Sequence, residues 1–147
     1  MPALMLDVRN IEALWPGIKN TVIKSARIPD KDKEEYSIFV LRGLYSGLYQ
    51  AWMAFNWVEG EKEIHAMMVT SLNDDNLTGM RYLYVNGIYG YRVLTNEMIL
   101  DLDKCMVDFA KSQGCNYIRC ETNLDRIEEI LKFANYEYES TVYKKEL

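Results

Sequence analysis

The sequence predicts a single α+β domain, spanning residues 1–147, with a mixed and mostly antiparallel sheet flanked by helices. Its length of 147 residues suits one domain with a full core. Apolar residues recur at helical spacing before Gly47, alternate with a period of two between Leu48 and Val85, and return to helical spacing after Thr95. Helices first, strands next and helices again at the end is an element order of α+β folds.

The opening helix is predicted from an apolar stripe that Pro16 interrupts. An interior proline removes a hydrogen-bond donor and clashes with the preceding turn, whereas the first helical position tolerates it. We therefore expect a short turn over residues 10–14 and a main helix over residues 16–24. The stripe consists of Ile11, Leu14, Trp15, Ile18 and Val22.

A second helix is predicted to begin at Asp32, which together with Glu35 resembles a capping box. We expect this helix to run to about Ser46, because Gly47 is placed to end it. Three antiparallel strands are predicted after it, over residues 48–56, 63–72 and 80–85. The first of these has apolar groups on both faces, which is typical of a strand covered on both sides.

The segment over residues 82–122 predicts a strand–turn–helix–strand unit. Its strand runs into a turn that Gly87 and Gly90 mark, and Thr95 or Asn96 is placed to cap the helix that follows. This helix ends at Gln113 and Gly114, and a return strand is predicted over residues 117–122. The amides and the positive dipole end of such a helix suit an anionic ligand. A short helix near residues 127–134 and a closing strand or hairpin over residues 136–145 complete the prediction.

Composition and charge argue against several classes of function. The formal net charge of −5 disfavours general nucleic-acid binding, which requires lysine and arginine to neutralise phosphates. No apolar stretch has the length of a signal peptide or a membrane span. The three cysteines lack metal-ligand or redox spacing, and with His65 as the single histidine we expect no metal site. We expect the chain to work reduced, in a cytoplasm.

With this element order, the chain resembles the GNAT (N-acetyltransferase) superfamily. The residues from Phe109 to Cys115, leading to Ile118 and Arg119, are similar to the end of that family's cofactor helix and its next strand. More narrowly, the chain is similar to small GNAT-like proteins encoded by bacteriophages. The residues that carry this second resemblance lie at 14–16, 47–52, 69–70 and 110–115.

The resemblance implies acetyl-CoA as cofactor, held by main-chain amides on either side of the glycine-marked turn. The family's motif, Gln/Arg-x-x-Gly-x-Gly/Ala, is not reproduced by any window of this chain, and glycines in such a place also mark a bulge or a tight bend. The cofactor-binding residues that the resemblance implies are Val85, Asn86, Gly87, Gly90, Tyr91, Arg92, Val93 and Leu94.

For catalysis, the resemblance implies a tyrosine on the late helix as general acid, but Leu131 stands at that position. Tyr136, Tyr138 and Tyr143 are substitutes that spacing does not distinguish. Glu121, at the end of the return strand, is a candidate acid/base residue, with a solvated strand-end carboxylate as the alternative.

Two functions therefore stand against each other. The first is acetyl transfer from acetyl-CoA to an amine of a small molecule or a protein. The second is a non-catalytic, phage-encoded protein that binds a protein partner as a virion or host-interaction component, in the host cytoplasm or the virion. In either case a strand over residues 138–143 would allow a homodimer by edge pairing.

Overall fold

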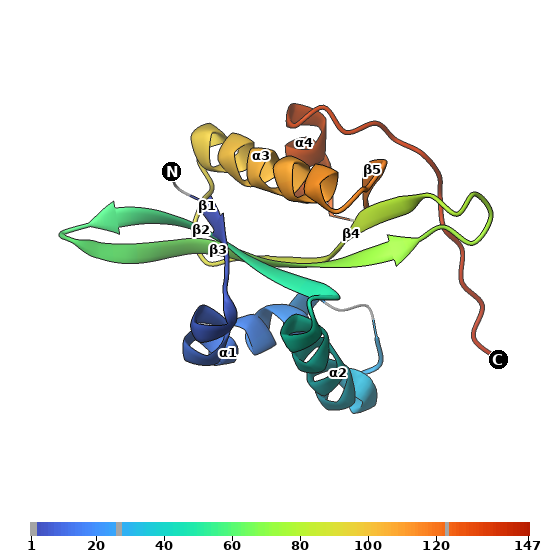
Figure 1. Ribbon diagram of the computed structural model, residues 1–147, viewed down its shortest axis with the longest axis horizontal. Helices are drawn as coiled ribbons and strands as arrows, with labels where there is room; N and C mark the ends of the chain where they lie inside the picture. The colour runs from blue at the N-terminus through green and yellow to red at the C-terminus, as the bar shows by residue number, and fades with distance from the viewer. Residues whose placement is uncertain (1–2, 26–27, 123) are drawn as a thin grey trace.

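A five-stranded sheet separates two pairs of helices, in a computed structural model that describes residues 3–25, 28–122 and 124–147. α1 and α2 cover one face of the sheet, and α3 and α4 cover the other (Figure 1). In chain order the elements are β1 (Ala3–Met5), α1 (Val8–Ser25), a 3-10 turn (Asp30–Asp32), α2 (Lys33–Ser46), β2 (Tyr49–Val58), β3 (Glu61–Asp74), β4 (Arg81–Gly90), α3 (Asn96–Ser112), β5 (Tyr117–Cys120) and α4 (Asp125–Phe133).

The strands lie in the order β1-β2-β3-β4-β5, with antiparallel pairing throughout except for the parallel pair of β4 and β5. This confirms the predicted α+β class with a mixed, mostly antiparallel sheet. Because side chains alternate along each strand, the sheet supplies apolar groups to both helix layers. Met53 and Val69 pack toward α1 and α2, whereas Trp52 and Leu83 pack toward α3.

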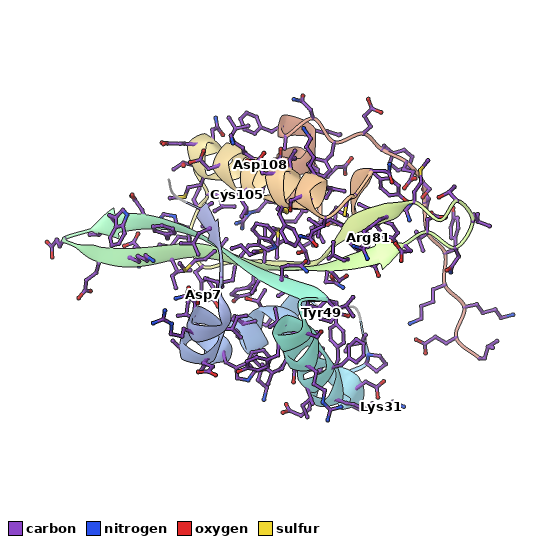
Figure 2. The ribbon with its side chains drawn as sticks, viewed as in Figure 1. Asp7, Lys31, Tyr49, Arg81, Cys105 and Asp108 are labelled. Atoms are coloured by element: carbon purple, nitrogen blue, oxygen red, sulfur yellow. The ribbon has the colours of Figure 1, made fainter. Side chains whose placement is uncertain are left out.

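Side chains fill both layers between the sheet and the helices (Figure 2). On α3, Cys105 lies on the sheet-facing side with its Sγ 3.7 Å from the Ala3 carbonyl oxygen, while Asp108 is exposed and pairs with Lys104. This amphipathic arrangement is the one that the spacing of apolar residues predicted. The caps predicted at Thr95 and Gly47 are also confirmed, since Thr95 Oγ1 accepts from the Met98 amide and Gly47 has a φ of 84° at the end of α2.

The prediction for the N-terminal segment was wrong in two respects. β1 was not predicted, because three residues are too few for a pattern. α1 runs without interruption through Pro16, instead of a turn over residues 10–14 and a helix from residue 16. Ile11 and Ile18, on either side of the proline, are 3% and 1% exposed. Burial of both halves of the helix on the sheet therefore outweighs the missing hydrogen bond.

Three further predictions need correction. The capping box at Asp32 does not form, since the Asp32 side chain makes no capping hydrogen bond. The glycine-marked turn is strand, because β4 continues to Gly90. No strand forms over residues 136–145, where Tyr138 and Tyr143 are 79% and 91% exposed. The alternating apolar residues of this last segment have no apolar surface to pack against, so packing does not stabilise a strand here.

A buried chain of polar side chains links β2 to β3 under α3. Trp52 Nε1 donates to Thr70 Oγ1 at 2.9 Å, and that hydroxyl donates to Gln50 Oε1 at 2.8 Å. The Gln50 amide nitrogen in turn donates to the Gly47 carbonyl at 2.8 Å. All three side chains are at most 6% exposed. The hydroxyl is thus the one group that satisfies both a buried donor and a buried acceptor.

We predict that Thr70→Val lowers the free energy of unfolding by at least about 2 kcal/mol, because it leaves the Trp52 donor and the Gln50 acceptor without this hydrogen-bond partner. The matched control is Thr70→Ser, which keeps the hydroxyl and costs about 1 kcal/mol for the lost methyl group. Urea unfolding of the three proteins measures both values. Equal losses for the two variants would contradict the role given to the hydroxyl.

Candidate functional site

The site begins where β4 and β5 part. The two strands pair from Tyr82 with Tyr117 to Val85 with Cys120, where β5 ends. β4 continues to Gly90, paired only with β3. In the described part of the chain, the outer edge of β4 beyond Val85 therefore has no neighbouring strand. Such an edge presents main-chain donors and acceptors to an extended ligand.

A β-bulge marks the same point. Val69 of β3 faces Gly87 and the next residue, Thr70, faces Val85, so Asn86 is an extra residue in β4. Asn86 and Gly87 both turn toward α1 and α2, where they line a small crevice with Ser25 and other side chains. A Cβ on Gly87 would collide with the Ser25 hydroxyl, so Gly87 is required for the close approach of α1.

The Asn86 side chain is unusual in its surroundings. Its Oδ1 is buried and has no hydrogen-bond partner among the described residues. Beside it lies Tyr36, whose pKa is raised by burial, an effect that a hydrogen bond from the Asn86 side chain partly offsets. An unsatisfied buried acceptor at a bulge is a feature that calls for an explanation.

On the opposite face, a cavity of about 50 Å³ lies under the parted strands, between them and the helices α3 and α4. Its lining is apolar except for Asp103 and Tyr136. Of the residues predicted from the sequence, Val85, Leu94 and Tyr136 line this cavity. The remaining lining residues are Met68, Ile88, Ile99, Leu102, Met106, Cys120, Ile127, Ile130, Leu131 and Ala134.

Tyr136 donates a hydrogen bond to Asp103 Oδ1 at 2.9 Å, which fastens the segment after α4 to α3. Burial and then the Asp103 carboxylate raise the pKa of Tyr136 well above its usual value. Burial also raises the pKa of Asp103. A tyrosine whose proton is held in this way is a poor proton donor to a reacting group.

The connection from β4 to α3 is held by His65, an extra residue in β3 opposite Ala54 and Phe55. Its carbonyl accepts from the Tyr91 amide at 2.8 Å and the Arg92 amide at 3.1 Å, and its Nδ1 lies 2.9 Å from the Val93 carbonyl oxygen. Two of the amides predicted to bind a cofactor are thus bonded within the chain.

Charges around this connection are also internally paired. Glu63 Oε1 lies 3.4 Å from Arg92 Nε, and 3.2 Å from His65 Nε2, with which it makes no well-directed hydrogen bond. Arg92, predicted as a counter-charge for a ligand, therefore has a carboxylate beside it already. Glu97 places another carboxylate in the first turn of α3.

Two residues complete this edge of the molecule. Arg126 of α4 reaches over Gly90, whose missing Cβ would lie 3.1 Å from an Arg126 guanidinium nitrogen. Glu121 is exposed immediately after β5, and no described residue pairs with its carboxylate. The predicted residues thus divide into three places: Val85, Leu94 and Tyr136 at the cavity, Asn86 and Gly87 on the other face, and the rest along the connection or in solvent.

Sequence reasoning missed Asp103, His65 and Arg126. The spacing of residues along the helix does not distinguish Asp103 from its other carboxylates, and only the fold brings Tyr136 to it. His65 stood out in the sequence only as the single histidine, within a predicted strand. That position does not indicate that it would contact the connection that begins at Tyr91, 26 residues later.

The fold has many relatives among solved structures. No protein-family model matches the sequence, and no curated protein matches it. A putative acetyltransferase from Pyrococcus furiosus is 16% identical, with a TM-score of 0.69 and 99% of each chain covered. A predicted acetyltransferase from Clostridium acetobutylicum, solved with acetyl-CoA, is 20% identical, with a TM-score of 0.67, covering 99% of this chain and 94% of that one.

An aminoglycoside 6'-N-acetyltransferase from Acinetobacter haemolyticus is 14% identical, with a TM-score of 0.68, covering 100% of this chain and 99% of the other. At such identities the likeness shows the fold alone, and this chain shares the fold of these acetyltransferases. Among the described residues no helix has the length and apolar character to cross a membrane, and no cluster of histidine, cysteine and carboxylate side chains is arranged to hold a metal.

The Asp103 carboxyl gives a pH-dependent prediction. Because its pKa is raised in the folded chain, it favours folding below its unfolded pKa, and this contribution is lost as the pH rises through the folded pKa. At pH 7 the ionised group therefore opposes folding. We expect Asp103→Asn, whose side-chain oxygen still accepts the hydrogen bond from the Tyr136 hydroxyl, to stabilise the chain at pH 7. The gain should be less than about 1 kcal/mol, since the group is only half buried.

Thermal unfolding at pH 7 and at pH 3 measures this effect, which should shrink at the lower pH. Asp108→Asn is the control on the same helix. Lys104 lowers the pKa of Asp108, so this change should not stabilise the chain at pH 7. Equal stabilisation by Asp103→Asn at both pH values would contradict the assignment.

Proposed function

We propose that this chain binds the pantetheine arm of acetyl-CoA between β4 and β5 and transfers the acetyl group to an amine. The parting of the two strands after Val85 and Cys120 carries this proposal. It combines an unpaired strand edge with an apolar cavity beneath it. An extended arm with amide groups can pair with such an edge while its methylene groups contact the cavity.

The residues present fit one end of acetyl-CoA better than the other. Val85, Ile88 and Leu94 give an apolar lining for the arm. The phosphate end meets a less favourable surface, because the Tyr91 and Arg92 amides already bond His65 and Glu97 adds a negative charge. Thr95 caps the Met98 amide, so the amides of Asn96 and Glu97 are the donors left at the start of α3, since they have no partner within the helix.

When bound, acetyl-CoA supplies an activated acetyl thioester for attack by an amine nitrogen. The chain's own contribution is to hold the reactants at the parted strands and to keep water from them, which by itself gives large rate increases. Proton removal from the amine is not assigned to Tyr136, whose own proton Asp103 holds. Glu121 is exposed beside β5, so this carboxylate is the remaining candidate base.

A non-catalytic binding protein on the same fold is the second candidate. It is favoured by the carboxylate of Glu97 at the start of α3 and by the internally bonded amides of the connection. Fold alone does not decide between the two. A phage origin, a virion role and a dimer stay predictions from the sequence, and the acceptor, an amine of a small molecule or of a protein, is part of the proposal.

The first test is calorimetric titration with acetyl-CoA and CoA, for which we expect micromolar dissociation constants. Ala134→Leu adds bulk to the cavity wall and should weaken binding at least about tenfold, because the arm and the new side chain compete for the same space. Ala13→Leu, on the exposed side of α1, is the matched control and should change nothing.

Release of free CoA thiol in the presence of amines then separates the two candidates. Binding with turnover supports the transferase, whereas binding without turnover for any amine tested supports the non-catalytic protein. No heat of binding at millimolar acetyl-CoA would overturn the proposal.

Glu97 gives a second prediction. Glu97→Gln removes a negative charge from the end of α3 nearest the proposed phosphates, so the affinity for CoA should rise about threefold to tenfold, and less in high salt. The same change removes a favourable contact with the helix dipole, so stability should fall by about 0.3–1 kcal/mol. Unchanged affinity in low salt would place the phosphates away from α3. Glu128→Gln on α4 serves as a charge-matched control.

A further inference from the structure

Arg119 lies at the parting of the strands, on the face opposite the cavity. It precedes Cys120, the last residue of β5 that pairs with β4. Ile118 and Cys120 pack against the α3 side of the sheet, so Arg119 and Tyr117 lie on the other face. This is the face to which Asn86 of the bulge also turns.

Two aromatic rings hold the Arg119 guanidinium in place. Its Cζ lies 4.9 Å from the centroid of the Tyr82 ring and 5.2 Å from that of Tyr117. These rings stack on each other with centroids 5.1 Å apart. The Tyr117 hydroxyl is fixed in turn by a hydrogen bond to Asp75 Oδ2 at 3.2 Å. Arg119 is therefore oriented before any ligand arrives, which lowers the entropic cost of binding.

The chain supplies its own carboxylate to this guanidinium. Arg119 Nε and Nη2 each lie 3.2 Å from one oxygen of Glu139, the two-pronged geometry in which arginine recognises carboxylates. Glu139 stands in the segment after α4, which has no regular structure and passes the end of the sheet to the other side (Figure 1). Glu139 is 65% exposed, against 27% for Arg119.

The exposure of Glu139 decides how easily the contact opens. An ion pair with one largely exposed member contributes little to stability. Its neighbours in the segment, Tyr138 and Val142, are 79% and 64% exposed, so they add little packing. The carboxylate of another molecule can therefore replace Glu139 without unfolding the domain.

We propose that Arg119, with Tyr82 and Tyr117, forms a carboxylate-binding site and that Glu139 is its internal, displaceable occupant. The ligand class is an amine acceptor that carries a free carboxylate, such as an amino acid or a peptide, and this part rests on the proposed function. A singly charged carboxylate suits the site better than a phosphate dianion, because Asp75 lies within the cluster and the chain carries a formal net charge of −5.

The test is a titration of the 147-residue chain with N-acetylglycine, in which binding is followed by the NMR signal of the Arg119 Nε–H group. Glu139→Gln frees the guanidinium, so we expect saturable shifts and at least about threefold tighter binding than in the unmodified chain. N-acetylglycinamide, which has no charge, should not shift the signal. N-acetylaspartic acid α-amide tells whether a side-chain carboxylate serves as well as a terminal one.

Glu137→Gln, a neighbouring carboxylate with no ion-pair partner among the described residues, is the matched control and should behave like the unmodified chain. In the double variant Arg119→Gln, Glu139→Gln, titration followed by the neighbouring main-chain signals should show no saturable binding. Equal binding by Glu139→Gln and Glu137→Gln would overturn the proposal. Unfolding of Glu139→Gln would also overturn it, because the contact would then be a structural clamp.

The titration requires no acetyl-CoA, so it decides the carboxylate site even if the transferase proposal fails. If the transferase proposal holds, Glu139→Gln should raise kcat/KM for glycylglycine and leave it unchanged for glycylglycinamide. Equal changes for both acceptors would separate the site from acceptor recognition.

Discussion

The loss of pairing between β4 and β5 after Val85 and Cys120 is the constraint on which the rest of the site depends. Had β5 continued, its backbone would fill the edge of β4 and close the space above the cavity. Because it stops, β4 keeps an open outer edge beyond Val85, with a cavity on one face of the sheet and the Arg119 cluster on the other. The bulge at Asn86 lies at the same point, so the strand changes direction where its neighbour leaves it.

A second bulge, at His65, fixes the chain that leads from the open edge into α3. Its carbonyl and ring bond three consecutive residues of that connection. The connection is thereby ordered without a ligand, but fewer of its amides remain for one. The hydrogen bonds that order the connection therefore reduce the number of amides that can bind a ligand. An ordered connection favours the transferase, and the occupied amides favour the non-catalytic protein.

The fold could be predicted from the sequence wherever a strong period coincided with a clear boundary. The stripe of α3 with Thr95 as its cap, the strand alternation of β2 and β3, and Gly47 at the end of α2 are examples. Prediction failed where long-range packing overrode a local signal, as at Pro16, or where local alternation lacked a surface to cover, as after Ala134. At the site, Val85, Leu94 and Tyr136 were predicted from the sequence and line the cavity, but the contact of Tyr136 with Asp103 was not predicted, because no local pattern joins the two residues.

The sequence by itself determined the class of fold, the order of most elements and the absence of a glycine motif before α3, because these follow from periods and residue types along the chain. Only the tertiary structure decided what Gly87 and Gly90 do. They are strand residues, the first pressed against Ser25 and the second under Arg126. It also placed Arg119 between two tyrosine rings and beside Glu139. These contacts join residues distant in sequence, and local periodicity contains no information about them.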